Sequence, residues 1–173
     1  DRCSTGLIGE QLPMDVMRGG VPAAVAALAP GQRAAAEAAE AIMTTDTVPK
    51  QACVSGAGWS VGGMAKGAGM LAPGLATMLV VLTTDAVLGA EELSLALKEA
   101  CRITFNRTDS DGCMSTNDTV VLMSSGASAQ RPDQVEFTRA LTAVCHSLAQ
   151  QLITDAEGAS HDLSLIHISE PTR

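Results

Sequence analysis

Thr77 is the residue of this chain best placed to act as a nucleophile. It follows a glycine- and proline-rich stretch, residues 62–76, and directly precedes an unbroken apolar run at 78–82. A continuous apolar run of this length, bounded by turn residues, predicts a strand buried on both faces. The order of these segments therefore predicts that a loop presents one threonine hydroxyl at the start of a rigid, buried strand.

A threonine hydroxyl needs a base beside it before it can attack a carbonyl group. One known solution places the threonine first in a chain, so that its own α-amine accepts the proton. A free α-amine titrates near about 7.7–8.0, which suits general-base catalysis at neutral pH. Thr77 acquires such an amine only if the Ala76–Thr77 bond is cut, and self-cleavage is the natural route. Spacing alone leaves a plainer interpretation open, because threonine is also a common β-former at strand starts.

Four segments extend the pattern beyond this junction. They are STGLIG at 4–9, AIMTTDT at 41–47 with PK at 49–50, KGAGMLAPGLATML at 66–79 followed by TTDA at 83–86, and STNDTV at 115–120. In this order they closely resemble motifs of the glutamate N-acetyltransferase/ornithine acetyltransferase family of arginine biosynthesis. The likeness covers most of residues 3–162, and it implies acetyl transfer from N-acetylornithine to glutamate.

The resemblance also implies a mechanism and the residues that perform it. The chain would cleave itself between Ala76 and Thr77, Thr77 would hold the acetyl group as an ester, and glutamate would collect it in a ping-pong scheme. Thr5 and Gly6 match the family's oxyanion hole, in which a hydroxyl and a backbone N–H stabilise the developing negative charge. From the residues alone, this glycine-containing segment is typical of a plain turn.

Thr44 and Lys66 are the residues that the resemblance assigns to substrate binding. Lys66 would bind a substrate carboxylate, which suits amino-acid substrates, and the bare backbone of Gly67 and Gly69 would let an anion approach. Without the resemblance, a lone lysine indicates a solvated surface charge, and the polar cluster at 44–47 indicates a helix end and a turn. The glycine spacing matches neither common nucleotide-binding motif, so nucleotide binding is poorly supported.

No cofactor and no metal site are expected. The resemblance adds that some family members also use acetyl-CoA as a co-substrate, and no residue here decides whether this chain does. Residues 108–112 lack the acidic ladder and the closing glutamate of a calcium loop, so they indicate a turn. His146 is expected on or near the inner face of a long helix, in a structural role.

Charge and cysteine content set further limits. The net charge of −8 and the pI near 4.7 argue against nucleic acid and anionic membranes as partners. The five cysteines are scattered and form no C-x-x-C pair. This pattern disfavours a disulfide framework or a zinc site and favours a reduced, cytoplasmic protein. No apolar run reaches the roughly 18 residues that suggest a membrane span.

Hydrophobic periodicity predicts an α/β fold, with helices layered on mixed sheets. The resemblance implies the family's αββα-like sandwich, present here only in part. Two short helices that meet at Gly19–Gly20 are expected within 13–28, and Val135 is expected on the inner face of the last helix. The other expected elements are helices at 31–43, 90–105 and 132–153, a hairpin of strands at 51–55 and 59–65, and strands at 78–82 and 118–124.

The resemblance divides the chain into three parts. Residues 1–76 correspond to the C-terminal part of an α chain, and residues 77–162 to the N-terminal part of a β chain. Residues 163–173, LSLIHISEPTR, have no likeness to the family and resemble a translated sequencing adapter, so we interpret them as a non-native tail. The family's front portion and its later substrate residues have no counterpart here, which leaves open whether the chain alone cleaves itself or is active. The resemblance suggests an assembly of α and β chains, a heterotetramer.

Two other classes of function stay open. An N-terminal-nucleophile hydrolase or aminopeptidase would share the threonine and the oxyanion hole but pass the acyl group to water, releasing acetate without a need for glutamate. A non-catalytic binding module would keep Lys66 and its glycines yet stay uncut at Thr77. Its ligand binding would survive the Thr77→Ala substitution unchanged.

Overall fold

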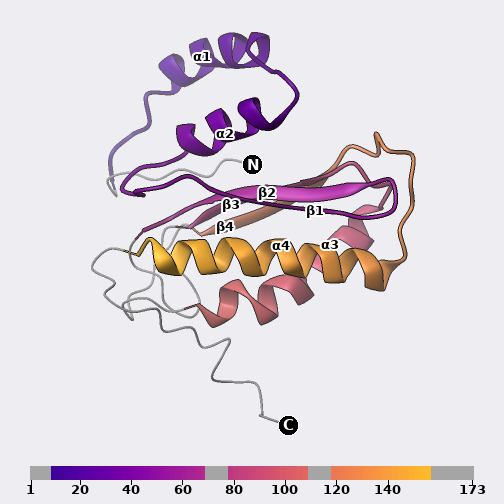
Figure 1. Ribbon diagram of the computed structural model, residues 1–173. Helices are drawn as coiled ribbons and strands as arrows, with labels where there is room; N and C mark the ends of the chain where they lie inside the picture. Colours follow the sequence, from indigo (N-terminus) through magenta and orange to yellow (C-terminus); the bar gives the residue numbers. More distant parts are fainter. Residues whose placement is uncertain (1–8, 69–77, 109–117, 157–173) are drawn as a thin grey trace.

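The computed structural model describes residues 9–68, 78–108 and 118–156. In these ranges the chain forms one four-stranded mixed sheet with helices on both sides of it (Figure 1). The α/β class and the mixed sheet are therefore confirmed. In chain order the elements are α1 (Met14–Ala26), α2 (Gln32–Ala41), β1 (Lys50–Ser55), β2 (Ser60–Lys66), β3 (Leu79–Thr84), α3 (Ala90–Ile103), a short 3-10 helix η1 (Phe105–Arg107), β4 (Thr119–Ser124) and α4 (Gln134–Thr154).

The strands lie in sequence order, β1-β2-β3-β4. β1, β2 and β3 pair antiparallel, and β3 pairs parallel with β4 through the α3 connection. The β1–β2 hairpin turns at Gly56, whose N–H donates to the carbonyl of Trp59 at 2.8 Å, and at Gly58, whose φ of 80° favours glycine. The parallel pairing matters for the site, because it places the starts of β3 and β4 at the same end of the sheet.

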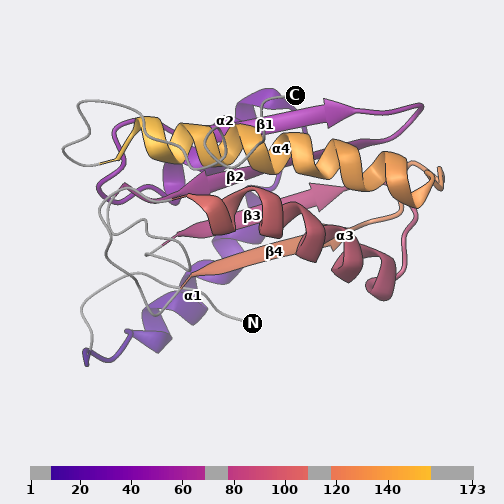
Figure 2. The ribbon, with the colours of Figure 1, turned by 90° about the horizontal axis from the view of Figure 1, so that it is seen from below.

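Helices α3 and α4 pack side by side on one face of the sheet. Figure 2 shows α4 across β1 and β2, with α3 over β3 and β4. Asp133 is the N-cap of α4, and its carboxylate accepts the N–H groups of Val135 and Glu136. The core between helices and sheet is mostly aliphatic, with Trp59 against Phe137 as its aromatic pair. Its fully buried side chains include Val61, Val80, Leu82, Leu141, Val144, Leu148 and Leu152.

Two details of the helices differ from the sequence prediction. Residues 14–26 form a single helix that continues through Gly19–Gly20 and contains Pro22. No residue of α1 is buried, so the carbonyl that Pro22 leaves without a backbone donor can be hydrogen-bonded by water. Val135 was expected to face inward but is 76% exposed. It lies in the first turn of α4, on the side away from the sheet, while Leu141 and later apolar residues face the core as expected.

Strand β3 is only partly buried, which corrects the expectation of burial on both faces. Val80 and Leu82 face the helices and are at most 1% exposed, whereas Leu79 and Val81 on the opposite face are half-buried. α2 contacts β1 and β2 and buries Ala39 on the side opposite α4 (Figure 1). The described residues form one sheet, so the second sheet of an αββα sandwich is not among them.

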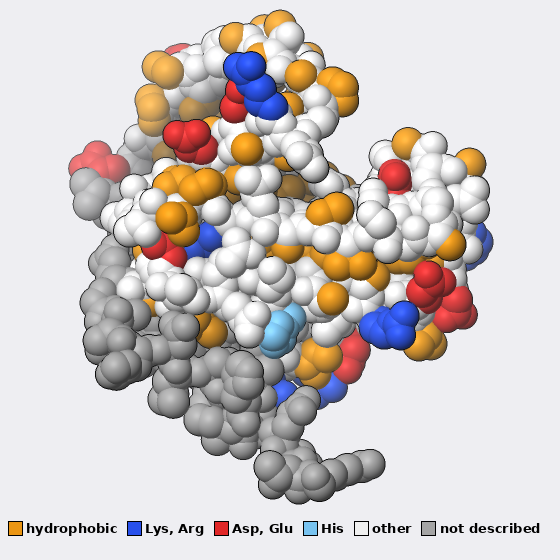
Figure 3. All heavy atoms as spheres, in the orientation of Figure 1, with side chains coloured by type: hydrophobic (Ala, Val, Ile, Leu, Met, Phe, Trp, Pro, Cys, Tyr) orange, Lys and Arg blue, Asp and Glu red, His pale blue; other side chains and the backbone are white. Residues whose placement is uncertain are grey.

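Helix α1 carries apolar side chains on its surface. Figure 3 shows apolar side chains at the top of the molecule, where α1 and α2 lie. Those of α1 include Val16 at 74% exposure, Val21 at 58% and Val25 at 59%. Within the described ranges no helix is both long and apolar enough to cross a membrane. The stability of the fold therefore comes from the sheet with α3 and α4, to which α1 contributes little burial.

Gly63→Ala is expected to destabilise the sheet. A Cβ at Gly63 would stand 2.5 Å from the carbonyl oxygen of Val81 and 2.7 Å from Leu82 Cδ2, closer than atoms can pack without moving β3. We expect a loss of about 1–3 kcal/mol, the usual cost of overpacking, measured as a lower midpoint of denaturant unfolding. Gly20→Ala is the matched control, because its Cβ would meet no atom within 4 Å. Gly20→Ala should raise the helix content measured by circular dichroism, and it should not lower the midpoint of denaturant unfolding.

Candidate functional site

Two of the predicted site residues, Thr44 and Lys66, are brought together by the fold. The Lys66 ammonium donates to Thr44 Oγ1 at 2.8 Å, across 22 residues of sequence. Lys66 ends β2 and Thr44 lies in the loop between α2 and β1. Thr5, Gly6, Ala76 and Thr77 lie outside the described residues, so their roles stay predictions. Residues 163–173 also lie outside them.

Lys66 is a buried cation and not a solvated surface charge. It is 3% exposed, although lysine is almost never buried without a partner. Burial lowers the pKa of Lys66, the carboxylate of Asp46 raises it, the Lys50 ammonium lowers it and the carboxylate of Asp118 raises it, with a net pKa below the ordinary value. Among the described residues its hydrogen-bond partner is the neutral Thr44 hydroxyl, and a buried cation of this kind is suited to bind an anionic group.

Asp46 is the residue that holds this part of the site together. Its Oδ1 accepts the N–H of Gly67 at 2.6 Å and the ammonium of Lys50 at 2.7 Å, and its Oδ2 accepts the N–H of Thr44 at 3.1 Å. Burial raises the pKa of Asp46, but these hydrogen bonds outweigh it and hold the pKa below its usual value. One ionised carboxylate therefore fixes the backbone beside both Thr44 and Lys66.

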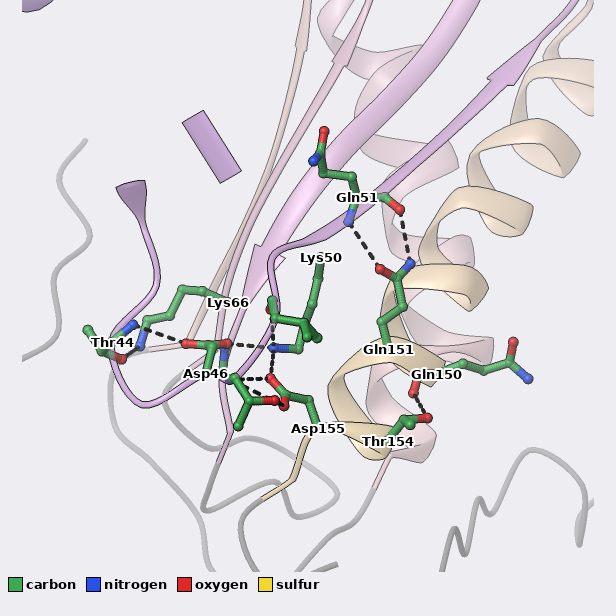
Figure 4. A network of polar contacts seen from close by, with 12 residues as sticks. Thr44, Asp46, Lys50, Gln51, Lys66, Gln150, Gln151, Thr154 and Asp155 are labelled. Atoms are coloured by element: carbon green, nitrogen blue, oxygen red, sulfur yellow. Dashed lines mark hydrogen bonds and ion pairs between the residues drawn. The ribbon is translucent and has the colours of Figure 1, made fainter. Parts of the chain in front are cut away.

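Lys50 extends the network to the end of α4. Its side chain is fully buried and its ammonium also donates to Asp155, whose carboxylate is 4% exposed (Figure 4). Asp155 in turn accepts the N–H of Thr47 at 3.0 Å. Burial raises the pKa of Asp155, and the hydrogen bonds from Lys50 and Thr47 lower it to a net value below the ordinary one. Three charged groups from a loop, a strand and a helix end therefore form one buried ion cluster.

Gln151 ties β1 to α4 beside the cluster. Its side-chain oxygen accepts the N–H of Gln51 at 3.1 Å, and its side-chain NH₂ donates to the carbonyl of Gln51 at 3.0 Å. Figure 4 shows this paired contact above the Lys50 ammonium. An open pocket of about 400 Å³ lies nearby, and its described lining includes Asp155 but none of the substrate-binding candidates. Its lining is Thr47, Val48, Ser147, Gln150, Gln151, Thr154 and Asp155.

Asp118 is a site residue that the sequence analysis did not single out. It lies directly before β4, and its Oδ1 accepts the N–H of Met78 at 2.6 Å. Its Oδ2 is buried and has no hydrogen-bond partner among the described residues. Burial raises the pKa of Asp118 to about 6, against the lowering effects of the Met78 N–H and the Lys66 ammonium. The only signal in the sequence was its position within the STNDTV motif.

Other candidate chemistry finds no support in the described ranges. Burial raises the pKa of Cys101 to about 11 and that of Cys145 to about 12, so both thiols stay protonated at neutral pH. Cys53, Cys101 and Cys145 are unpaired. No group of three His, Cys, Asp or Glu side chains that could hold a metal ion occurs in the part of the chain that the structure describes. His146 is half-buried on α4.

Comparison with known proteins supports the family resemblance that the four motifs carry. The ArgJ family model matches residues 2–170. An arginine biosynthesis bifunctional protein ArgJ from Streptomyces avermitilis is 62% identical over 162 residues, covering 94% of this chain and 42% of that protein. The Thermobifida fusca protein of the same name is 59% identical over 163 residues, with 94% and 42% covered. A crystal structure of the Bacillus halodurans protein shares 40% identity and a TM-score of 0.43, covering 47% of this chain and 40% of that one.

The chain belongs to the ArgJ family. This confirms the resemblance that the four motifs carried. The chain spans about two-fifths of the length of the curated relatives it matches.

Proposed function

We propose that this chain forms part of an acetyltransferase that moves an acetyl group from N-acetylornithine to glutamate in arginine biosynthesis. The relatives are named for arginine biosynthesis, and the four motifs occur in family order. The observation that carries the proposal is the buried Lys66 ammonium, which donates to Thr44 Oγ1 and would pair with a substrate carboxylate. Both substrates are amino acids that offer such a carboxylate.

The proposed reaction runs in two half-reactions through Thr77. After cleavage of the Ala76–Thr77 bond, the Thr77 hydroxyl attacks the acetyl carbonyl and its proton passes to the α-amine. Thr5 and Gly6 stabilise the oxyanion; the bond to ornithine breaks, and the α-amine returns the proton to the leaving amine. The neutral amine of glutamate then attacks the acetyl ester, and Thr77 recovers its hydroxyl. Each half-reaction is balanced without an external cofactor.

Thr44 and Lys66 would bind the substrate during both half-reactions. Their geometry depends on Asp46, which fixes the backbone of Thr44 and of Gly67 next to Lys66. Because the cation and the hydroxyl are set by buried contacts before substrate arrives, little ordering cost is paid on binding. We also propose that the whole protein adopts the family's αββα-like sandwich, in which residues beyond those described supply the second sheet.

The proposal includes the setting of the enzyme. Residues 1–76 and 77–162 would be parts of the α and β chains of one precursor, assembled as a heterotetramer in the cytoplasm. Unpaired cysteines at 53, 101 and 145 agree with a reducing compartment. Acetyl-CoA is a possible second acetyl donor, and nucleic acid is not expected as a partner because the net charge is −8.

Lys66→Met is expected to weaken substrate binding. The substitution keeps a side chain of similar length but removes the positive charge that would meet the carboxylate. We expect KM for N-acetylornithine and for glutamate to rise by about 10–100-fold, the loss of a charge-assisted hydrogen bond. Steady-state kinetics on the full-length form, meaning the chain extended to the length of its relatives, measure the effect. Lys98→Met, at an exposed position on α3, is the matched control and should leave KM unchanged.

The test of the function is the fate of a labelled acetyl group. N-acetylornithine labelled in the acetyl carbon is incubated with the full-length form, with and without glutamate. Labelled N-acetylglutamate that appears only with glutamate supports the transferase. Labelled acetate that forms at the same rate without glutamate would instead identify a hydrolase. Binding of N-acetylornithine with no turnover and an uncut chain would contradict both catalytic assignments.

A further inference from the structure

Asp46 joins the two segments that carry the substrate-binding candidates. Thr44 is exposed in the loop between α2 and β1, whereas Lys66 is buried at the end of β2. Asp46 Oδ2 accepts the N–H of Thr44 at 3.1 Å. Its Oδ1 accepts the N–H of Gly67, the residue after Lys66, at 2.6 Å and across 21 residues of sequence. One carboxylate therefore holds the backbone on both sides of the contact between the Thr44 hydroxyl and the Lys66 ammonium (Figure 4).

The charge of Asp46 acts on the same ammonium. Burial has the largest effect on the pKa of Lys66 and lowers it. The strongest opposing effect comes from the carboxylate of Asp46, which raises this pKa. The Lys50 ammonium on β1 lowers it, and the carboxylate of Asp118, directly before β4, raises it. Lys66 attracts a carboxylate only while it is protonated, so the negative charge of Asp46 favours the form that binds.

We propose, resting on the proposed function, that Asp46 is a positioning residue that sets the affinity of the site for substrate carboxylates. Its side chain is fully buried, so it acts through Thr44 and Lys66 and does not touch the substrate. Without this carboxylate the exposed loop at Thr44 would have to be ordered by the substrate, which lowers affinity. The effect therefore falls on substrate binding and not on the chemical step.

Asp155 offers a matched comparison within the same ion cluster. Like Asp46, it is buried, and its carboxylate accepts the Lys50 ammonium and a backbone N–H, that of Thr47. Among the described residues its contacts reach neither of the two backbone groups that Asp46 holds. Loss of the Asp155 carboxylate thus weakens the cluster and leaves the substrate-binding pair in place.

Asp46→Asn removes the charge and one of the two backbone contacts. The amide oxygen should keep the position of Oδ1, where Gly67 and Lys50 both donate, so the NH₂ group faces the Thr44 N–H. Two donors cannot bond, and the Thr44 loop is released. In the full-length form we expect KM for N-acetylornithine and for glutamate to rise about tenfold, with kcat within about twofold of the wild type. Both constants of D155N should stay within about twofold.

The pH dependence of KM tests whether the charge acts through Lys66. KM should be low below the pKa of Lys66 and rise as the pH passes through it, because the ammonium loses its charge. Without the Asp46 carboxylate this pKa is lower, so the rise should begin at a lower pH in D46N than in the wild type or D155N. Burial raises the pKa of Asp118 to about 6, so that carboxylate is ionised in all three forms above about pH 7. Titration of the substrate amines is also common to the three forms.

Each outcome supports or overturns the proposal. A higher KM in D46N that rises from a lower pH, beside an unchanged D155N, supports it. Equal KM in wild type and D46N overturns it, as does an equal rise in both variants, which would reflect a weakened ion cluster. A higher KM with the pH profile of the wild type also overturns it, because the loss would not act through Lys66. A D46N form that folds but stays uncut would assign Asp46 to chain processing and overturn it.

Failure of the proposed function gives a different result. In that case the wild type itself transfers no acetyl group, which is distinct from an active wild type beside an equally active D46N.

A second pair of variants covers the case in which D46N does not fold. The form D46N/K50M/D155N makes the whole cluster neutral, and such replacements of buried ion pairs are often tolerated. Its partner K50M/D155N differs only at residue 46, where it keeps the carboxylate. A higher KM in the triple variant supports the proposal. Equal KM in the two forms overturns it, and so does failure of either form to fold, which would assign the cluster to structure alone.

Discussion

Thr77→Ala is expected to abolish both chain cleavage and acetyl transfer. Alanine removes the hydroxyl that would attack the preceding carbonyl during cleavage and the acetyl carbonyl during turnover. In other enzymes, loss of the nucleophile lowers kcat by about 10⁴-fold or more, and a comparable loss is expected here. Intact mass under denaturing conditions measures the first effect, and transfer of labelled acetyl to glutamate measures the second.

Thr77→Ser is the matched control, since serine keeps the hydroxyl and the potential α-amine. The wild type and this variant should each give two pieces whose masses sum to the parent plus one water. The second piece should begin at residue 77. A Thr77→Ala form that still splits at this bond, or that still transfers acetyl groups, would show that the nucleophile is another residue. An uncut 17.7 kDa chain beside a cleaved full-length form would assign cleavage to segments beyond this chain.

The parts of the fold that sequence predicted are those fixed by local patterns. The apolar run at 78–82 became β3, the glycine-rich turn at 56–58 became a hairpin, and the periodic apolar residues of 132–153 became α4. Predictions failed where the local signal did not decide the outcome. Val135 has the right type for an inner face but is 76% exposed, whereas Phe137, two residues later, is fully buried. α1 is continuous through two glycines and a proline although none of its residues is buried.

The sequence predicted some residues of the candidate site and missed others. Thr44 and Lys66 were found through the resemblance, and their hydrogen bond agrees with a shared role. Asp155 joins Lys50 across 105 residues, and no periodicity or spacing links them. Asp118 meets Met78 only because β3 and β4 pair in one particular parallel register. Such contacts depend on tertiary packing, so the motifs could point to these residues without giving their partners.

Lys50→Met is expected to cause a large loss of stability. Lys50 is fully buried between Asp46 and Asp155, and methionine would fill its space without its charge. Two buried carboxylates would then face each other without a cation between them, although both keep their backbone N–H donors. Breaking a buried ion pair on one side costs about 3–5 kcal/mol, and a loss in this range should appear as a lower midpoint of urea unfolding at pH 7. Lys98→Met, which changes the same residue type on the exposed side of α3, should cost less than about 0.5 kcal/mol.

The pH dependence gives this prediction a second, independent test. In the wild type, the folded pKa values of Asp46 and Asp155 lie below their ordinary values. Their contribution to stability is therefore present above the unfolded pKa of about 3.9 and is lost as the pH falls through the folded pKa values. Without the Lys50 ammonium both folded pKa values should rise, so the carboxylates of the variant take up protons at a higher pH than those of the wild type. The stability difference between wild type and variant should thus be largest near pH 7, where the carboxylates are ionised, and shrink as the pH falls through the folded pKa values of the variant. A difference that stays constant down to the pH at which both carboxylates are protonated would mean that lost packing, and not the ion cluster, accounts for the destabilisation.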